Sequence, residues 1–141
     1  METIKRRNVL VERAGENVRI LRFVRPCLHD QLYEDADADI FPLFQELFEQ
    51  ALADLHEGQV VILNLGLVEY FSAAFYRCLL KVREVVAARH AELLLCRLSP
   101  EHEEIFQLFR GFDLFRVTAT EGRAVHEATG GRKWRGRARQ K

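Results

Sequence analysis

The hydrophobic positions of the chain follow two patterns, short continuous runs and spacings of three and four residues. Residues 60–65 read Val-Val-Ile-Leu-Asn-Leu, which has the length and β-branched content of a strand buried on both faces. Residues 91–98 form a second apolar run. Between the two runs, five residues recur at the spacing of one helix face: Phe75, Cys78, Leu79, Val82 and Val86. Strand, helix and strand in succession predict parallel strands joined by a right-handed crossover.

The N-terminal part of the chain predicts a β-hairpin and a helix. Residues 4–12 and 18–24 are the expected hairpin arms, because the turn-forming sequence Ala-Gly-Glu-Asn lies between them. Residues 42–55 have the clearest helical spacing in the sequence, with Pro42 at a first-turn position and Gly58 after the end. We expect the Phe and Leu side chains of this helix to lie in the core.

A further helix is expected after the second apolar run. Ser99 and Pro100 favour a helix start, because a Ser side chain caps free N–H groups and Pro suits the first helical position. The apolar side of this helix would come from Ile105, Phe106, Leu108 and Phe109. Gly111 would end it.

A short edge strand and a last helix complete the expected elements. The strand is predicted over residues 117–120, and Thr120 would cap a helix over 121–128. These elements predict an α/β single domain over residues 1–128, with parallel central strands in a mixed β-sheet, helices that cover it and an N-terminal hairpin. Residues 129–141 lack apolar periodicity and are expected to form a basic, flexible tail.

Composition and charge narrow the class of protein. Hydrophobic residues make up 48% and charged residues 30% of the 141 positions, the balance of a soluble globular domain. The net charge is zero, but residues 132–141 hold six Lys or Arg and no acid, so the rest of the chain carries six net negative charges. No apolar stretch approaches the roughly 20 residues that cross a bilayer, and the charged start is unlike a signal peptide. We therefore expect a cytoplasmic protein without a membrane span.

The residue types that serve enzymes and metal sites are scattered along the chain. The five histidines are expected to be exposed polar residues: His29, His56, His90, His102 and His126. The three cysteines, Cys27, Cys78 and Cys96, lack metal-binding spacing. They are interpreted as reduced core residues, and this interpretation is weakest for Cys27, which lies in a predicted loop. The acidic cluster at residues 34–39 lacks the Gly of a calcium-binding loop and is interpreted as a solvated loop or as the cap-rich N-terminal region of a helix. With no phosphate-binding Gly motif either, the sequence predicts a protein that is not an enzyme and uses no cofactor or metal.

One segment, residues 64–74, resembles the central segment of the STAS domain, a family named for sulphate transporters and anti-sigma-factor antagonists. It reads Asn-Leu-Gly-Leu-Val-Glu-Tyr-Phe-Ser-Ala-Ala, where the family typically has Asp-Leu-Ser-Gly-Val-x-Phe-Ile-Asp-Ser-Ser. Residues 93–100 and 105–115 are similar to the Leu-rich strand, Ser-Pro helix start and helix end of the same family. The resemblance covers residues 4–128 and implies the STAS fold.

The resemblance also implies a protein partner, commonly an anti-sigma-factor kinase, that binds around the loop and the first turns of the helix. In many antagonists this kinase phosphorylates the first Ser after the second Asp, and the added charge ends binding. Ala73 occupies that position, which implies that the switch is lost. The candidate partner-binding residues are Tyr70, Ser72, Ala73, Ala74 and Tyr76. Ser72 is interpreted as a helix cap or, alternatively, as a displaced phosphorylation site. Tyr70 and Tyr76 are interpreted as exposed aromatic anchors or, alternatively, as rings packed over the sheet edge.

The sequence thus predicts a protein-binding domain of bacterial signalling that resembles anti-sigma-factor antagonists and lacks the usual serine switch. One alternative is nucleic-acid or acidic-partner binding through the tail, where basic residues and glycines surround Trp134. Another is a scaffold subunit in a larger STAS assembly, with self-association into a homo-oligomer.

Overall fold

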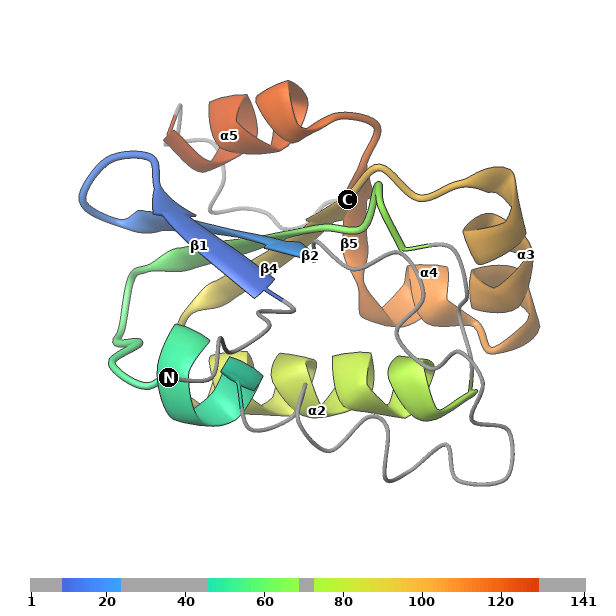
Figure 1. Ribbon diagram of the computed structural model, residues 1–141, viewed down its shortest axis with the longest axis horizontal. Coiled ribbons are helices and arrows are strands. Elements are labelled where there is room, and N and C mark those ends of the chain that lie inside the picture. The colour runs from blue at the N-terminus through green and yellow to red at the C-terminus, as the bar shows by residue number, and fades with distance from the viewer. Residues whose placement is uncertain (1–8, 24–45, 69–72, 130–141) are drawn as a thin grey trace, which may run out of the picture.

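The computed structural model describes residues 9–23, 46–68 and 73–129, which form one five-stranded sheet with helices on both faces (Figure 1). The strands lie side by side in sequence order: β1 (Val9–Arg13), β2 (Val18–Phe23), β3 (Val60–Asn64), β4 (Glu92–Cys96) and β5 (Arg116–Thr118). β1 runs antiparallel to β2, and each later pair of neighbours is parallel. The mixed sheet with parallel central strands is therefore confirmed.

The N-terminal hairpin is also confirmed within the described residues. Val9 pairs with Phe23, and the turn is closed by the Ala14 N–H, which donates to the Val18 carbonyl oxygen at 2.9 Å. Gly15 has a φ of 102°, a conformation that residues with a side chain rarely adopt. Gly15 therefore allows the chain to turn between β1 and β2 at this position.

The helices form two layers. η2 (Glu46–Ala51) and α2 (Ala73–Ala88) lie on one face of the sheet, and α5 (Glu121–Thr129) lies on the other (Figure 1). α3 (Pro100–Leu108) and α4 (Gly111–Leu114) connect β4 to β5. The strand–helix–strand unit β3–α2–β4 has the parallel arrangement that the apolar runs predict.

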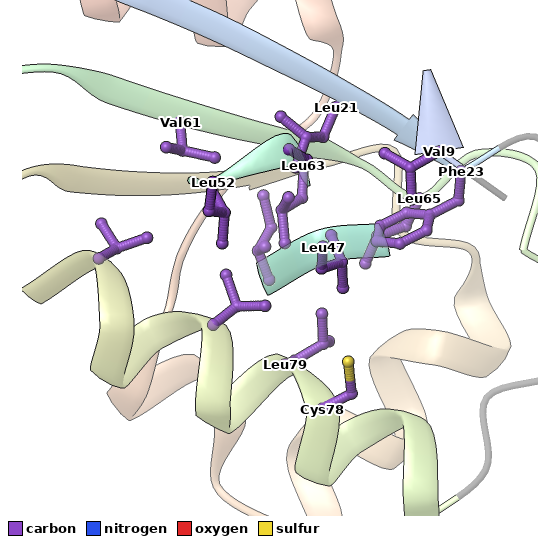
Figure 2. Close-up of a cluster of buried hydrophobic side chains, with 14 of the residues drawn as sticks. Val9, Leu21, Phe23, Leu47, Leu52, Val61, Leu63, Leu65, Cys78 and Leu79 are labelled. Carbon is purple, nitrogen blue, oxygen red and sulfur yellow. The ribbon is translucent and has the colours of Figure 1, made fainter. Parts of the chain in front are cut away.

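The core has two parts because successive side chains of a strand point to opposite faces. The larger part lies between the sheet, η2 and α2, and Figure 2 shows Leu47 of η2 among Leu63 and Leu65 of the sheet side and Leu79 of α2. The helical face predicted for α2 is confirmed, since its five members are all buried: Phe75, Cys78, Leu79, Val82 and Val86. The smaller part contains strand residues that pack against Ala124 of α5: Val18, Ile20, Val60, Ile62, Leu94 and Cys96.

Of the helix predicted over residues 42–55, residues 46–51 form a helix of the wider π type, and the prediction that the helix continues to residue 55 is wrong because the chain turns after Ala51. The Leu52 N–H donates to the Leu47 carbonyl oxygen at 2.8 Å, five residues back instead of four. This winding still places Leu47, Ala51 and Leu52 in the core, as the apolar spacing predicts. Residues 42–45 lie outside the described part of the chain, as do Cys27, His29 and the acidic cluster at 34–39.

The predicted start of α3 is confirmed, whereas the apolar side predicted for this helix is not. The Ser99 hydroxyl accepts from the His102 N–H at 3.1 Å, and Pro100 occupies the first helical position. Of the expected apolar residues only Phe106 is fully buried, whereas Leu108 is 75% exposed and Phe109 is also exposed. The helix ends at Leu108, so the side of α3 that meets the rest of the domain is limited to His102 and Phe106, one turn apart.

Gly111 does not end α3 but begins α4. The residue with a left-handed backbone at this bend is Arg110, with a φ of 59°. Gly111 is buried, and a Cβ at this position would lie 2.7 Å from Cδ2 of Phe106 and 3.1 Å from the Tyr76 hydroxyl oxygen. The glycine is therefore required by the close approach of the Phe106 ring.

The last helix confirms its predicted cap. The Thr120 hydroxyl accepts from the Arg123 N–H at 3.0 Å, and α5 follows as far as Thr129. β5 is an edge strand, as expected, but it begins one residue earlier than predicted, at Arg116, and ends two residues earlier, at Thr118.

Candidate functional site

The candidate site is the corner, by which we mean residues 64–68 at the end of β3 together with the first turn of α2, residues 73–76. After the last residue of β3, the Leu65 N–H still donates to the Cys96 carbonyl oxygen of β4 at 3.0 Å. The chain then turns, because the Asn64 side-chain oxygen accepts from the Gly66 N–H at 2.8 Å and the Leu65 carbonyl oxygen accepts from the Val68 N–H at 3.1 Å. Leu67 projects from this turn and is 57% exposed.

Asn64 is also part of a polar network that joins the corner to α5. Its side-chain Nδ2 donates to Oε1 of Glu121 at 2.7 Å. The same carboxylate accepts from Nε and Nη2 of Arg22, at 2.9 and 2.6 Å, and Arg22 also forms an ion pair with Glu12. The Arg22 hydrogen bonds hold the pKa of Glu121 below its usual range, and the two carboxylates raise the pKa of Arg22.

Sequence reasoning overlooked this network, although a signal for it exists. Arg22 interrupts the apolar alternation of β2, and Glu121 is an acid in the first turn of α5. Because β2 and β3 are parallel and Arg22 pairs with Asn64, both side chains lie at the carboxyl ends of their strands. Once the strand order is known, these residues are expected to lie close together.

His102 is buried next to the corner turn, so the prediction that it is exposed is wrong. Its ring is 1% exposed, and Nδ1 accepts from the Ser99 N–H at 3.1 Å. Burial lowers the pKa of His102, while a hydrogen bond with the backbone of Val68 acts in the opposite direction. His102 therefore connects the start of α3 to the last described residue of the corner turn.

Tyr76 is buried instead of exposed. Its ring stacks on Phe109 at a centroid distance of 4.9 Å and meets Phe106 edge to face at 5.6 Å. Only 5% of Tyr76 is exposed, and burial raises the pKa of its hydroxyl group. Of the two alternatives for Tyr76, an exposed anchor or a ring packed over the sheet edge, the exposed anchor is wrong, because α3 and α4 cover the first turn of α2 and enclose the ring.

The remaining predicted site residues fall into two groups. Ala73 is the first residue of α2 and is exposed, and Ala74 follows it in the helix. Tyr70 and Ser72 lie outside the described residues, and so does the proposed capping bond of Ser72. The structure thus brings Asn64, Gly66 and Ala73 to one end of the sheet.

Within the described residues, no group of three or more His, Cys, Asp or Glu side chains is placed to hold a metal ion. Cys78 and Cys96 are free, buried thiols, as expected, and burial raises the pKa of each to about 12. Of the helices in this same part of the chain, none has the length and apolar character to span a membrane.

The fold and the corner together define a STAS domain. The STAS domain family model matches residues 31–124, two thirds of the chain, and the chain belongs to this family. The resemblance of residues 64–74 to the central segment of the family is therefore confirmed at the level of the family.

Comparison with individual proteins gives the same result. The chain is 31% identical over 74 residues to the putative anti-sigma factor antagonist BtrV of Bordetella bronchiseptica, a match that includes 52% of this chain and 64% of BtrV. An anti-sigma-factor antagonist (STAS) domain protein from Planctomyces limnophilus superposes with a TM-score of 0.64 at 16% identity, over 86% of this chain and 97% of that one.

SpoIIAA, a Bacillus cell-fate determinant and anti-sigma factor antagonist, is similar in fold in both of its known forms. Its unphosphorylated form superposes with a TM-score of 0.56 at 16% identity, over 87% of this chain and 99% of that one. The phosphorylated form gives 0.53 at 17% identity, over 83% and 96%. The likeness to these solved structures concerns the fold.

Proposed function

We propose that the protein is a non-enzymatic binding module of bacterial signalling that acts as an anti-sigma-factor antagonist through the corner. The observation that carries this proposal is the exposure of Ala73 at the start of α2, the position to which the resemblance assigns the serine that the family's kinases phosphorylate. BtrV and SpoIIAA, both named as antagonists of anti-sigma factors, support the choice of partner, an anti-sigma factor with a kinase fold. Such a partner acts on transcription in the cytoplasm.

The corner has the properties of a docking surface. Leu67 offers exposed apolar area in the corner turn, Ala73 is exposed at the start of α2, and the buried Tyr76 and His102 hold the backbone of the corner in place. The proposed contact residues are Tyr70, Ser72, Ala73 and Ala74, with Tyr76 acting as a positioning residue from inside. A surface held rigid before binding loses little conformational entropy on association.

The proposed protein is not switched by phosphorylation at the usual place. An alanine has no oxygen that can accept a phosphoryl group, so binding at the corner persists in the presence of kinase and ATP. In SpoIIAA, by contrast, a phosphorylated form exists. Stoichiometric phosphate on Ser72, detected by intact-mass measurement after incubation with kinase and ATP, would show a displaced switch and contradict this part of the proposal.

The binding proposal is tested with Ala73→Glu, which places a negative charge on the corner. Purified anti-sigma-factor kinases from the source genome are titrated onto the immobilised chain, and we expect one of them to bind the wild type and to lose at least about tenfold in affinity for the variant. Because an acid is favourable at a helix N-terminus, the change does not weaken α2 itself. Ala87→Glu, an exposed position near the other end of α2, is the matched control and should bind like the wild type.

The basic segment supports a second candidate function. We propose residues 1–128 as the folded domain. The six Lys or Arg after residue 131 carry positive charge that would attract nucleic-acid phosphates, and Trp134 could stack on a base. Deleting residues 130–141 should abolish any salt-dependent retention of RNA or DNA, and retention that survives the deletion would exclude this function. Size-exclusion chromatography at several concentrations tests the remaining alternative, a homo-oligomeric scaffold.

A further inference from the structure

A pocket of about 470 Å³ lies between β1, β2 and the segment that follows η2. Its lining combines apolar walls with charged and polar groups: Val9, Val11, Arg13, Arg19, Gln50, Ala51, Ala53 and Asp54. Arg19 is the second residue of β2 and Arg22 the fifth, and successive odd and even positions face opposite sides of the sheet. The pocket therefore lies away from the corner network, on the η2 side and toward the amino end of β2.

Arg19 is the buried charge of this pocket, with only 2% of its side chain exposed. Its Nη1 donates to the Ala51 carbonyl oxygen at 2.7 Å, and its Nη2 donates to Oε1 of Gln59 at 3.1 Å. The third nitrogen, Nε, is buried without a hydrogen-bond partner among the described residues. Buried donors are nearly always satisfied in folded proteins, so this N–H indicates an acceptor from outside the described part of the chain.

The charges around the pocket indicate what kind of acceptor fits. Nη1 of Arg19 is 3.0 Å from Oδ1 of Asp54, and Nη2 of Arg13 is 3.8 Å from Oδ2 of the same carboxylate. Asp54 is ionised at neutral pH, as an exposed carboxylate ordinarily is, and the Arg19 charge lowers its pKa further. Among the described lining residues, two cations and one anion leave one net positive charge, which a single negative charge neutralises.

The volume of the pocket and its apolar walls indicate the size and polarity of the uncharged part of the ligand. The pocket has room for about fifteen water molecules at roughly 30 Å³ each. Val9, Val11, Ala51 and Ala53 offer aliphatic contact area on the walls. A ligand that fills this space has an apolar body attached to its charged group.

We propose that this pocket binds a small organic carboxylate, whose oxygens accept from Nε of Arg19 and from the Arg13 guanidinium and whose apolar part contacts Val9 and Val11. A carboxylate carries one negative charge at neutral pH, whereas a phosphate monoester carries nearly two. The pocket thus gives the domain a ligand site separate from the corner.

The proposal is tested by titrating the full chain, labelled with ¹⁵N, with acetate, butyrate, hexanoate and octanoate. We expect saturable amide shifts at Arg13, Arg19, Ala51 and Asp54, and an affinity that rises by up to about fourfold for each added methylene that is buried. Absence of saturable shifts below about 10 mM octanoate would overturn the proposal. Equal binding of inorganic phosphate and octanoate, or shifts confined to the corner, would also overturn it.

Two variants with opposite expected effects separate a site from general charge attraction. Arg13→Gln removes a half-exposed donor and should weaken octanoate binding by about threefold to tenfold. Asp54→Asn removes the competing anion, which is 72% exposed, and should strengthen binding by about twofold to fivefold. Arg116→Gln, which removes an equal charge at the far edge of the sheet on β5, should change affinity less than about twofold. Equal weakening by the Arg13 and Arg116 variants would refute the proposal.

Discussion

The contact between Gly111 and the Phe106 ring predicts that Gly111→Ala destabilises the domain. An added Cβ would lie 2.7 Å from Cδ2 and 2.9 Å from Cγ of Phe106, well inside ordinary van der Waals contact. The ring has little room to move, because it is fully buried and meets Tyr76 and Phe115 at centroid distances of 5.6 Å each. The strain must therefore be taken up by shifts of packed rings or of the backbone of α4.

The size of the effect follows from two opposing terms. Overpacking of a well-packed core costs about 1–3 kcal/mol. Replacing Gly by Ala in a helix recovers up to about 1 kcal/mol, and less in α4 because this helix is a single turn. We therefore expect the free energy of unfolding to fall by about 1–2 kcal/mol, which lowers the Tm by several degrees.

Urea denaturation followed by circular dichroism measures the change, and Gly122→Ala provides the matched control. Gly122 lies in α5, and its added Cβ would have only the Thr120 hydroxyl oxygen nearby, at 4.0 Å. This variant should gain about 0.5–1 kcal/mol from helix propensity. A Gly111→Ala protein as stable as the wild type would refute the argument that the ring approach fixes this glycine. Trimming the ring with Phe106→Leu should reduce the cost of the added methyl group, measured as a coupling energy in a double-mutant cycle.

Two further predictions concern the surroundings of the corner. Because burial lowers the pKa of His102 in the folded state, the unfolded state binds more protons as the pH falls below about 6.5, and the free energy of unfolding should decrease from there down to the folded-state pKa. His102→Gln should make the free energy of unfolding less dependent on pH, measured by urea titrations between pH 7.5 and 5. Gln is chosen because it can still form the capping box with Ser99. A pH dependence equal to that of the wild type would assign the effect to other groups. Asn64→Asp, which restores the residue typical of the family, should cost about 1–3 kcal/mol at pH 7, because it replaces the 2.7 Å hydrogen bond to Glu121 with two facing carboxylates. The same variant should lose most of this penalty near pH 4, and a penalty that does not depend on pH would point to a steric cause.

The features that the sequence predicts well are those set by local patterns. The apolar runs of β3 and β4 and the helical face of α2 between them were sufficient to predict a parallel strand pair, because strands covered by helices on both faces read as continuous apolar runs. Ser99 and Thr120 cap the helices that follow them, since a hydroxyl in that place satisfies N–H groups only one turn away. The resemblance of residues 64–74 to the STAS family located the candidate site.

The features that were missed depend on partners far away in the sequence. The sequence left open whether Tyr76 is exposed or packed over the sheet edge, because α3 and α4 cover it and no periodicity within α2 reveals that cover. The same reason explains His102 and Arg19, two buried polar residues whose hydrogen-bonding capacity is satisfied in part by groups far away in the sequence, the backbone of Val68 for His102 and Ala51 and Gln59 for Arg19. Leu108 was expected in the core because its spacing fits, yet the short length of α3 leaves it outside.

The packing of α5 on the second face of the sheet limits how far the folded unit can be shortened from its C-terminal side. Without this helix, the buried side chains of Ile20, Ile62 and Leu94 would meet water along the middle of the sheet, and Arg22 would lose its main carboxylate partner. A protease cut before residue 121 should therefore produce a fragment that precipitates, whereas a cut after residue 129 leaves both faces of the sheet covered.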